Sequence, residues 1–363
     1  MATIFPFNLT TLSNLKDSSL HQPRFNIKAD GTYNITTSIA MGSPGPLTIQ
    51  GYSSNVGDLG RATIDAGTSV ISIWNDNGQN NFTLADLIVQ NNGASGANHG
   101  FLCAGQNNLF LRCVANNIRG DGFVLGNSTG VIECEAYACN KSNTSGLCGI
   151  SLGTSASFAI SCIAHDNSGN LTDGFTSSTG ALGAVFINCI ADTNGRHGFS
   201  VFGGSSNQVM FLQCDSYNNV ADGLSILNTT LTSNVTIRNS NFIKNGGWGI
   251  NTAITTARLT GAIDNCGFGS GSQVNTSGQT NNIDAIVVNG SVTYASGVTP
   301  WVDPANGDFR INLAAAKGAG RGAFTETAGS YAGTIGYPDI GAAQHKDAAG
   351  GGLRLAGSGG LAA

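Results

Sequence analysis

The sequence has few charged residues, few prolines and no long apolar run. Charged residues make up 10% of the 363 residues, and only 7 residues are proline. No apolar stretch reaches the roughly 18 residues that a membrane span requires, so we expect no membrane insertion. The net charge is −5 and no basic run exists, which argues against a nucleic-acid partner because phosphate binding requires clustered cations.

The N-terminus also lacks a recognisable export signal. Residues 1–16 contain no basic region followed by an apolar region, which is the pattern of a classical secretory signal peptide. We expect a location on a virion or an extracellular surface. Either a signal peptide has been removed from this chain, or the protein leaves the cell by another route, such as virion assembly followed by lysis.

Glycine and regularly spaced apolar residues are abundant. The chain has 52 glycines, and 40% of its residues are hydrophobic, which excludes a disordered chain. This composition suits a fold with many tight turns and small side chains in stacked layers.

A short motif recurs about every 25 residues, consisting of a polar or small residue, a glycine and an apolar residue. A second motif, an apolar strand that ends near a cysteine, repeats at the same interval, and an asparagine follows most of these cysteines. The glycines are Gly100, Gly122, Gly149, Gly174, Gly198, Gly223 and Gly249; the second column is Cys113, Cys134, Cys162, Cys189, Cys214, Ser240 and Cys266; the third is Asn167, Asn194, Asn219 and Asn245. Three columns in a fixed register predict a coil of three short strands and three turns.

Each column has a physical interpretation. Equivalent residues of successive turns lie about 4.8 Å apart, so the apolar residues after glycine and the cysteines are predicted to stack in the core. We expect the cysteines to be reduced and to bind no metal, because disulfide geometry between parallel neighbours is poor and no Cys-x-x-Cys pair exists. Asparagine is predicted to adopt the left-handed conformation in a hydrogen-bonded turn ladder, and glycine to allow a bend that a β-carbon would obstruct.

Two segments outside the repeat support a family resemblance. Residues 47–52, LTIQGY, followed by residues 57–64, GDLGRATI, resemble the opening rungs of pectate-lyase-like right-handed parallel β-helix proteins. Residues 301–310 and 338–342 resemble the closing segment of the same family. The resemblance covers roughly residues 25–345 and implies an all-β fold, but the family includes lyases, hydrolases, adhesins and phage tail proteins, so it does not fix an activity.

The chain is predicted to contain four regions. Residues 1–26 form an N-terminal lead whose apolar side chains cap the first rung, and residues 27–300 form ten or eleven rungs. Residues 301–347 form a C-terminal cap in which Trp301 and Phe309 cover the last rung. Residues 348–363 form a Gly-rich tail, either flexible or a docking peptide that orders on a partner.

One mixed column could carry chemistry. Asp173, His197 and Asp222 precede successive repeat glycines, and Arg196 lies beside His197. Two carboxylates two rungs apart would be about 9–10 Å from each other, a separation nearer to inverting than to retaining glycosidases. The resemblance implies that a catalytic member would use a basic side chain, or a pair of Asp residues, on such a face. The alternative is ordinary Asp-Gly turn chemistry.

Further candidates for glycan binding are the polar turn residues His165, Asp166 and Asp192 and the tryptophans Trp74 and Trp248. A lone tryptophan can equally be a core residue. No metal-ligating motif is evident and no cofactor is expected, although the resemblance to lyases would allow Ca²⁺.

These observations favour a structural or receptor-binding β-helix, displayed on a virion (phage tail or capsid decoration) or a cell surface. Its polar lateral face would contact glycans or neighbouring virion or surface proteins. One alternative is a polysaccharide lyase or glycoside hydrolase acting on an extracellular glycan, and another is a self-assembling surface or filament protein. We expect a homo-oligomer, and the resemblance to phage β-helices allows a trimer.

Overall fold

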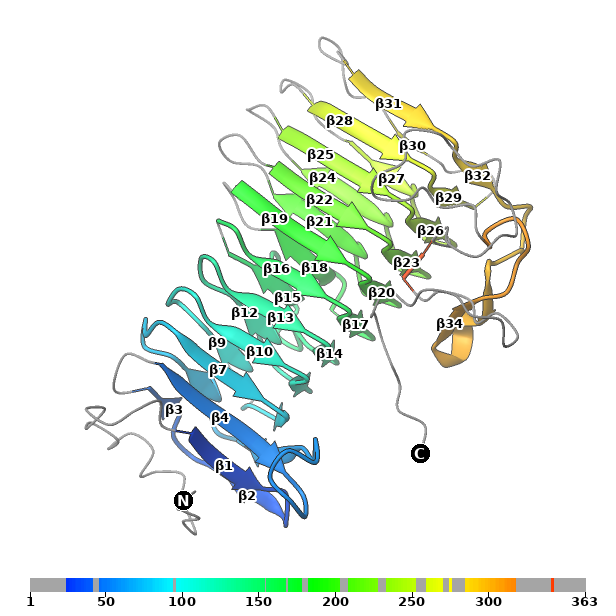
Figure 1. Ribbon diagram of the computed structural model, residues 1–363. Coiled ribbons are helices and arrows are strands. Elements are labelled where there is room, and N and C mark those ends of the chain that lie inside the picture. Colours follow the sequence, from blue (N-terminus) through cyan, green and yellow to red (C-terminus); the bar gives the residue numbers. More distant parts are fainter. Residues whose placement is uncertain are drawn as a thin grey trace. The chain divides into compact units, whose positions relative to one another are not determined.

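The computed structural model describes residues 24–317 and 341–342, apart from residues 42–45, 94–95, 154, 168, 178–181, 203–207, 228–232, 253–258, 270–273 and 276–284. The chain divides into two compact units. Unit 1 comprises residues 1–176 and 194–196, and unit 2 comprises residues 177–193 and 197–363. In each unit, successive strands enter sheets A, B and C in turn, and Figure 1 shows the strands of one sheet lying side by side.

Unit 1 contains three parallel sheets. Sheet A contains β1 (Arg24–Lys28), β4 (Leu47–Tyr52), β7 (Phe82–Ala85), β10 (Leu109–Leu111), β13 (Gly130–Ile132) and β16 (Phe158–Ile160). Sheet B contains β2 (Thr32–Asn34), β5 (Ala62–Asp65), β8 (Leu87–Gln90), β11 (Val114–Asn116), β14 (Glu135–Tyr137) and β17 (Ile163–His165). Sheet C contains β3 (Ile39–Ala40), β6 (Trp74–Asn75), β9 (Phe101–Leu102), β12 (Phe123–Val124), β15 (Cys148–Leu152) and β18 (Asp173–Ser177).

Unit 2 repeats this order. Sheet A contains β19 (Leu182–Ile187), β22 (Gln208–Leu212), β25 (Ser233–Arg238), β28 (Leu259–Asp264) and β31 (Ala285–Asn289). Sheet B contains β20 (Ile190–Asp192), β23 (Asp215–Tyr217), β26 (Asn241–Ile243), β29 (Gly267–Phe268) and β32 (Val292–Thr293). Sheet C contains β21 (Phe199–Phe202), β24 (Leu224–Leu227), β27 (Ile250–Asn251) and β30 (Val274–Asn275). An antiparallel pair, β33 (Trp301–Asp303) and β34 (Asp308–Ile311), follows and flanks a short 3₁₀ helix (Pro304–Asn306).

Within each unit, strands pair in parallel with the strand three places later in the chain, which confirms the predicted all-β parallel β-helix. The pairing of β10 with β13, for example, aligns Phe110 with Val131. The two early segments that suggested the family resemblance supply strands β4 and β5, separated by a turn. No helix in the described part of the chain is long and apolar enough to cross a membrane.

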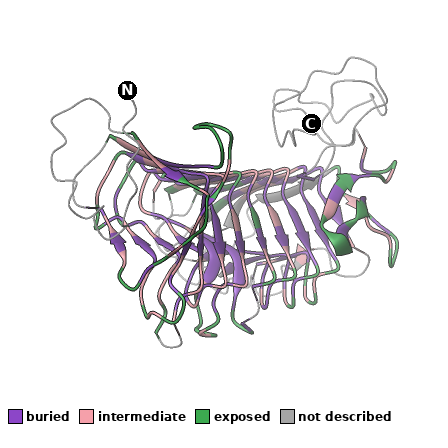
Figure 2. Cartoon of the chain, turned by 90° about the horizontal axis from the view of Figure 1, so that it is seen from below, coloured by how far each residue is buried: buried purple, intermediate pink, exposed green. Residues whose placement is uncertain are grey.

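The core lies inside the coil, where the predicted apolar columns are buried. Figure 2 shows the buried residues along the strands in purple. In unit 1, the rings of Phe101 and Phe123 stack with centroids 4.7 Å apart. All nine cysteines are buried free thiols. The backbone N–H of Cys113 donates to the Cys134 sulfur at 3.4 Å, and Ser240 takes the same role in unit 2 by accepting from the Cys214 N–H at 3.0 Å.

The repeat glycines are required by close contact between rungs. A β-carbon on Gly122 would lie 2.6 Å from the carbonyl oxygen of Gly149 in the next rung, and one on Gly223 would lie 2.6 Å from that of Gly249. Real side chains do not tolerate such contacts, so the columns can stack only when this position lacks a β-carbon.

The predicted asparagine ladder exists, with one correction. Asn167 donates to the Asn194 amide oxygen at 2.7 Å in unit 1, and Asn219 donates to that of Asn245 at 2.8 Å in unit 2. These asparagines do not adopt the predicted left-handed conformation; the residue before each of them does, with φ between 51° and 54°. The buried amide therefore serves to bond adjacent rungs, while its neighbour makes the turn.

The C-terminal segment packs on a lateral face instead of on the last rung, contrary to the prediction. Trp301 and Phe309 contact Tyr217, an outward-facing residue of β23, with ring centroids 5.4 and 6.0 Å from the Tyr217 ring. Together with Ile243 of β26 they form a small apolar core of their own. We call residues 294–316, which follow β32, the strap. Most of the predicted N-terminal lead (1–23) and the predicted tail (348–363) lie outside the described residues.

Candidate functional site

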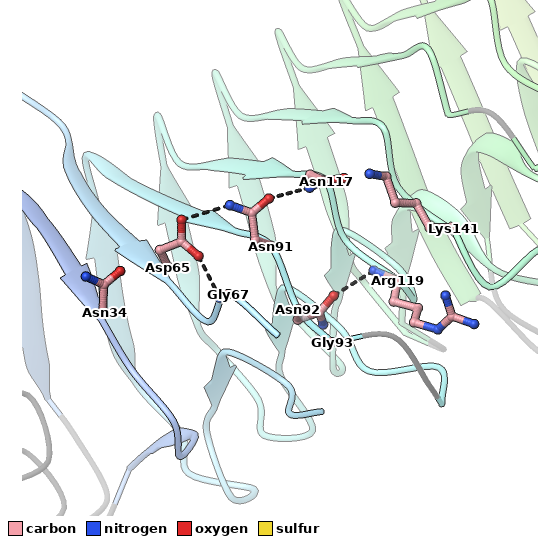
Figure 3. A pocket seen from close by; sticks show the side chains of 9 residues that line it. All are labelled: Asn34, Asp65, Gly67, Asn91, Asn92, Gly93, Asn117, Arg119 and Lys141. Carbon is pink, nitrogen blue, oxygen red and sulfur yellow. Dashed lines mark hydrogen bonds between the residues drawn. The ribbon is translucent and has the colours of Figure 1, made fainter. Parts of the chain in front are cut away.

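A polar groove crosses successive rungs of unit 1 at the turn that follows sheet B. It consists of two adjoining depressions of about 380 and 480 Å³ that share Arg119 and Lys141. Figure 3 shows the first, in which side chains from successive rungs stand in a row with the two cations at one end. The lining residues include Asn34, Asp65, Gly67, Asn91, Asn92, Asn117, Asn140, Asn143 and Asn170, and we call this surface the asparagine groove.

Backbone conformation explains why asparagine recurs here. Asn91 and Asn117 directly follow β8 and β11 and have φ values of 53° and 58°. Asparagine is one of the few residues that tolerates this left-handed region without strain. Because β8 and β11 are in register, the turns that follow these two strands each direct an amide toward the groove.

Hydrogen bonds fix this row of side chains. Asp65 accepts from the backbone N–H of Gly67 at 2.6 Å and from the side chains of Gln90 and Asn91 at 2.7 and 2.8 Å. The Asn117 amide nitrogen donates to the Asn91 amide oxygen. The groove wall is thus organised before any ligand arrives.

Two buried polar atoms in this wall have no hydrogen-bond partner within the described structure: Asn117 Oδ1, an acceptor, and Arg119 Nε, a donor. An unsatisfied buried polar atom is costly, so such atoms call for an explanation. A hydroxyl-rich ligand in the groove would supply both a donor and an acceptor.

The cations of the groove are available for binding. Among the described residues neither Arg119 nor Lys141 forms an ion pair, whereas Arg112 binds the buried Asp86 carboxylate at 2.7 Å. The backbone holds them on adjacent rungs, because the Ser142 N–H donates to the Arg119 carbonyl at 3.0 Å. The Arg119 N–H in turn donates to Asn92 Oδ1 at 2.7 Å.

The sequence prediction did not identify this groove. Arg119 lies six residues after Cys113, but Lys141 lies seven after Cys134, so the two cations form no column in the repeat. The one signal in the sequence that could have pointed to the groove is that cationic residues are scarce in this region. Between positions 62 and 195 the only Lys or Arg residues are Arg112, Arg119 and Lys141.

The structure places the predicted catalytic residues in buried positions. In unit 1, the Asp173 side chain is fully buried and pairs with Arg196 in a two-pronged ion pair, with Nε 2.7 Å from Oδ1. In unit 2, the side chains of His197 and Asp222 are only 11% and 8% exposed. A long polymer therefore has little access to these three side chains.

His197 and Asp222 bond to the backbone of neighbouring rungs. The Asp222 N–H donates to His197 Nδ1 at 3.1 Å, and the Trp248 N–H donates to Asp222 Oδ1 at 2.8 Å. Unit 1 contains an equivalent pair, in which the Asp121 N–H donates to His99 Nδ1 at 3.1 Å. The recurrence of this geometry favours the alternative prediction, in which the column stabilises turns.

The second predicted cluster is a charged network on the outward face of sheet B in unit 1. His165 lies 2.9 Å from Glu135 and 2.8 Å from Asp166 and stacks on Tyr137 at 5.1 Å. Burial lowers the pKa of His165, but its bonds to the two carboxylates outweigh this and raise the pKa above its ordinary value. The bond to His165 lowers the pKa of Glu135, against the opposing effect of burial.

The remaining candidates differ in exposure. Trp74 is completely buried between sheet neighbours in the core, so it cannot stack on a sugar. Trp248 is 38% exposed and remains accessible. Asp192, at the end of β20, is partly exposed and accepts a 2.8 Å hydrogen bond from Thr193. Within the described ranges, no group of three or more His, Cys, Asp or Glu residues is arranged to hold a metal ion.

The fold is similar to that of a solved pectate lyase. Pectate lyase Pel9A superposes with a TM-score of 0.58 at 19% identity, covering 89% of this chain and 88% of the lyase. The A-module of a mannuronan C-5 epimerase from Azotobacter vinelandii gives a TM-score of 0.47 at 15% identity, covering 76% of this chain and 86% of the module. No protein of curated function matches the sequence significantly.

A family profile described as "Right handed beta helix region" matches residues 99–299. The matched fold corresponds to about eight turns of about 26 residues, fewer than the ten or eleven rungs predicted for the whole coil. The described strands from β1 to β8, which pair in the same parallel manner, precede the matched region. Since the match spans more than half of the sequence and the strands coil as the profile requires, the chain belongs to the right-handed β-helix family.

Proposed function

We propose that this protein binds an extended glycan along the asparagine groove. The observation that carries the proposal is the row of ordered amides on successive rungs, together with the orphaned acceptor of Asn117 and donor of Arg119. Amides that both donate and accept hydrogen bonds match sugar hydroxyls. The rung spacing of about 4.8 Å is close to the length of one pyranose unit, so a polymer along the coil would place about one sugar at each rung.

Binding is better supported than cleavage. A general acid or nucleophile must reach the scissile bond, and Asp173, His197 and Asp222 are buried and bonded to neighbouring rungs. A pectate lyase with the same fold acts, by its name, on a polysaccharide, which agrees with a glycan as the ligand class. Display on a virion or cell surface is part of the same proposal, since extended glycans occur there.

Affinity electrophoresis of the full chain through gels that contain neutral or acidic polysaccharides tests the proposal. We expect retardation by at least one polysaccharide, and Asn117→Ala to weaken it about tenfold, the loss equivalent to one good hydrogen bond to a ligand. Asn306→Ala is the matched control, because Asn306 is exposed in the strap and, among the described residues, its side chain bonds to the nearby Asp303. Absence of retardation in every gel would refute glycan binding.

Cleavage is tested in the same samples. We expect no shortening of the polysaccharides on prolonged incubation. Depolymerisation that His197→Ala abolishes would instead establish the lyase or hydrolase alternative.

A further inference from the structure

The asparagine groove has an uneven distribution of charge along its length. Asp65 ends β5 and aligns with Gln90 of β8, which aligns with Asn116 of β11. Arg119 lies in the turn after β11, and Lys141 in the turn after β14. The order along the coil is therefore one anion, one rung with only amides, and two cations on adjacent rungs. Two rungs correspond to about 9–10 Å between Asp65 and the level of Arg119.

The anionic end is fixed in place. Gly67, Gln90 and Asn91 all donate to the Asp65 carboxylate, and no Lys or Arg in the described structure forms an ion pair with it. A ligand carboxylate next to Asp65 would be repelled, and the donors that could have received it are already engaged. This end of the groove accepts hydroxyl groups and disfavours acidic ones.

The cationic end has the opposite preference. Arg119 and Lys141 line both depressions, and Arg119 Nε has no partner among the described residues. A guanidinium and an ammonium on adjacent rungs suit one carboxylate or sulfate, because charge-assisted hydrogen bonds are about twice as strong as neutral ones. Asn140, Asn143 and Asn170 on the far side of the cations are again neutral.

We propose that the groove selects a heteropolysaccharide in which single acidic groups are separated by neutral sugars, an inference that rests on the proposed glycan binding. A neutral polymer would leave the two cations without a partner. A polymer with a carboxylate on every sugar would place one of them beside Asp65. Isolated acidic groups satisfy both ends of the groove.

Isothermal titration of the full chain with three polymers tests this selectivity: dextran (neutral), polygalacturonate (a carboxylate on every sugar) and deacylated gellan (one uronate within a repeat of otherwise neutral sugars). We expect gellan to bind about tenfold or more tightly than either of the others. Arg119→Gln and Lys141→Gln should each weaken gellan binding about tenfold. The matched control Arg310→Gln removes an exposed cation of the strap and should change nothing.

The decisive variant is Asp65→Asn, which keeps the size of the side chain and one of its two acceptor oxygens but removes its charge. We expect it to raise the affinity for polygalacturonate about tenfold. Polygalacturonate as the tightest ligand of the unaltered chain, or an affinity for it that Asp65→Asn does not change, would overturn the selectivity. Equal binding of dextran and gellan, insensitive to Arg119→Gln, would overturn the selectivity but leave glycan binding intact. Binding of none of the three would count against both proposals.

Discussion

Replacement of Trp301 should detach the strap while leaving the coil folded. Trp301 is 3% exposed, packs edge-on against Tyr217 and Phe309 at 5.4 and 5.2 Å, and donates from Nε1 to Asp215 at 3.2 Å. Truncation of a buried Trp to Ala costs about 3–5 kcal/mol, which combines lost apolar burial with the cavity left behind. Trp301→Phe keeps most of the packing and loses the bond to the carboxylate, so its cost should be nearer 1.5–3 kcal/mol.

Hydrogen exchange measured by mass spectrometry can separate detachment from global unfolding. Peptides from residues 294–316 should lose protection by about two to three and a half orders of magnitude in Trp301→Ala, since 1.4 kcal/mol corresponds to a tenfold change. Peptides from unit 1 should be unaffected. The control is Trp248→Ala, because Trp248 is 38% exposed. Equal exchange of the strap in both variants would show that Trp301 does not hold it.

Three further predictions concern the coil. Arg112→Ala should destabilise unit 1 by about 3–5 kcal/mol in urea denaturation, because it leaves the fully buried Asp86 carboxylate without its cation. Gly122→Ala should cost about 1–3 kcal/mol or prevent folding, because the new β-carbon would collide with the next rung. The pair of His165 and Glu135 should stabilise the fold most between about pH 4.3 and 6.5. The pKa of His165 is raised in the folded state, so its contribution to stability is complete below about pH 6.5 and is lost as pH rises through the folded-state pKa. The pKa of Glu135 is lowered, so its contribution to stability is complete above about pH 4.3 and is lost as pH falls through the folded-state pKa. His165→Gln should flatten this maximum in thermal melts recorded across that range.

Each of these predictions has a matched comparison. Arg310→Ala breaks an exposed ion pair with Asp308 and should leave stability nearly unchanged. Gly31→Ala places a β-carbon where nothing lies within 4 Å and should be nearly neutral. A loss of stability in Arg112→Ala or Gly122→Ala no larger than in its comparison, or a pH profile unchanged by His165→Gln, would contradict the corresponding explanation.

The repeat in the sequence was sufficient to predict the coil. A period of about 25 residues in register brings equivalent positions into contact, so residue type at each column reveals its environment. The environment of each position depends mainly on the equivalent position in the next rung. Phe123 and Cys134 are therefore buried, and Gly122 lies in close contact with the backbone of the next rung. Ser240 could be recognised as a substitute for cysteine on the same basis.

Contacts outside the repeat were decided only by the tertiary structure. The strap joins Trp301 to Asp215 across 86 positions, and no periodicity links them. The asparagine groove depends on which way turn side chains point, and its two cations stand at unequal distances from the cysteine column. Exposure separated Trp74 from Trp248, two residues that the sequence presented as equivalent candidates. The sequence by itself therefore determined the coil and its interior, whereas the lateral surface, where a ligand would bind, followed from long-range packing and side-chain direction.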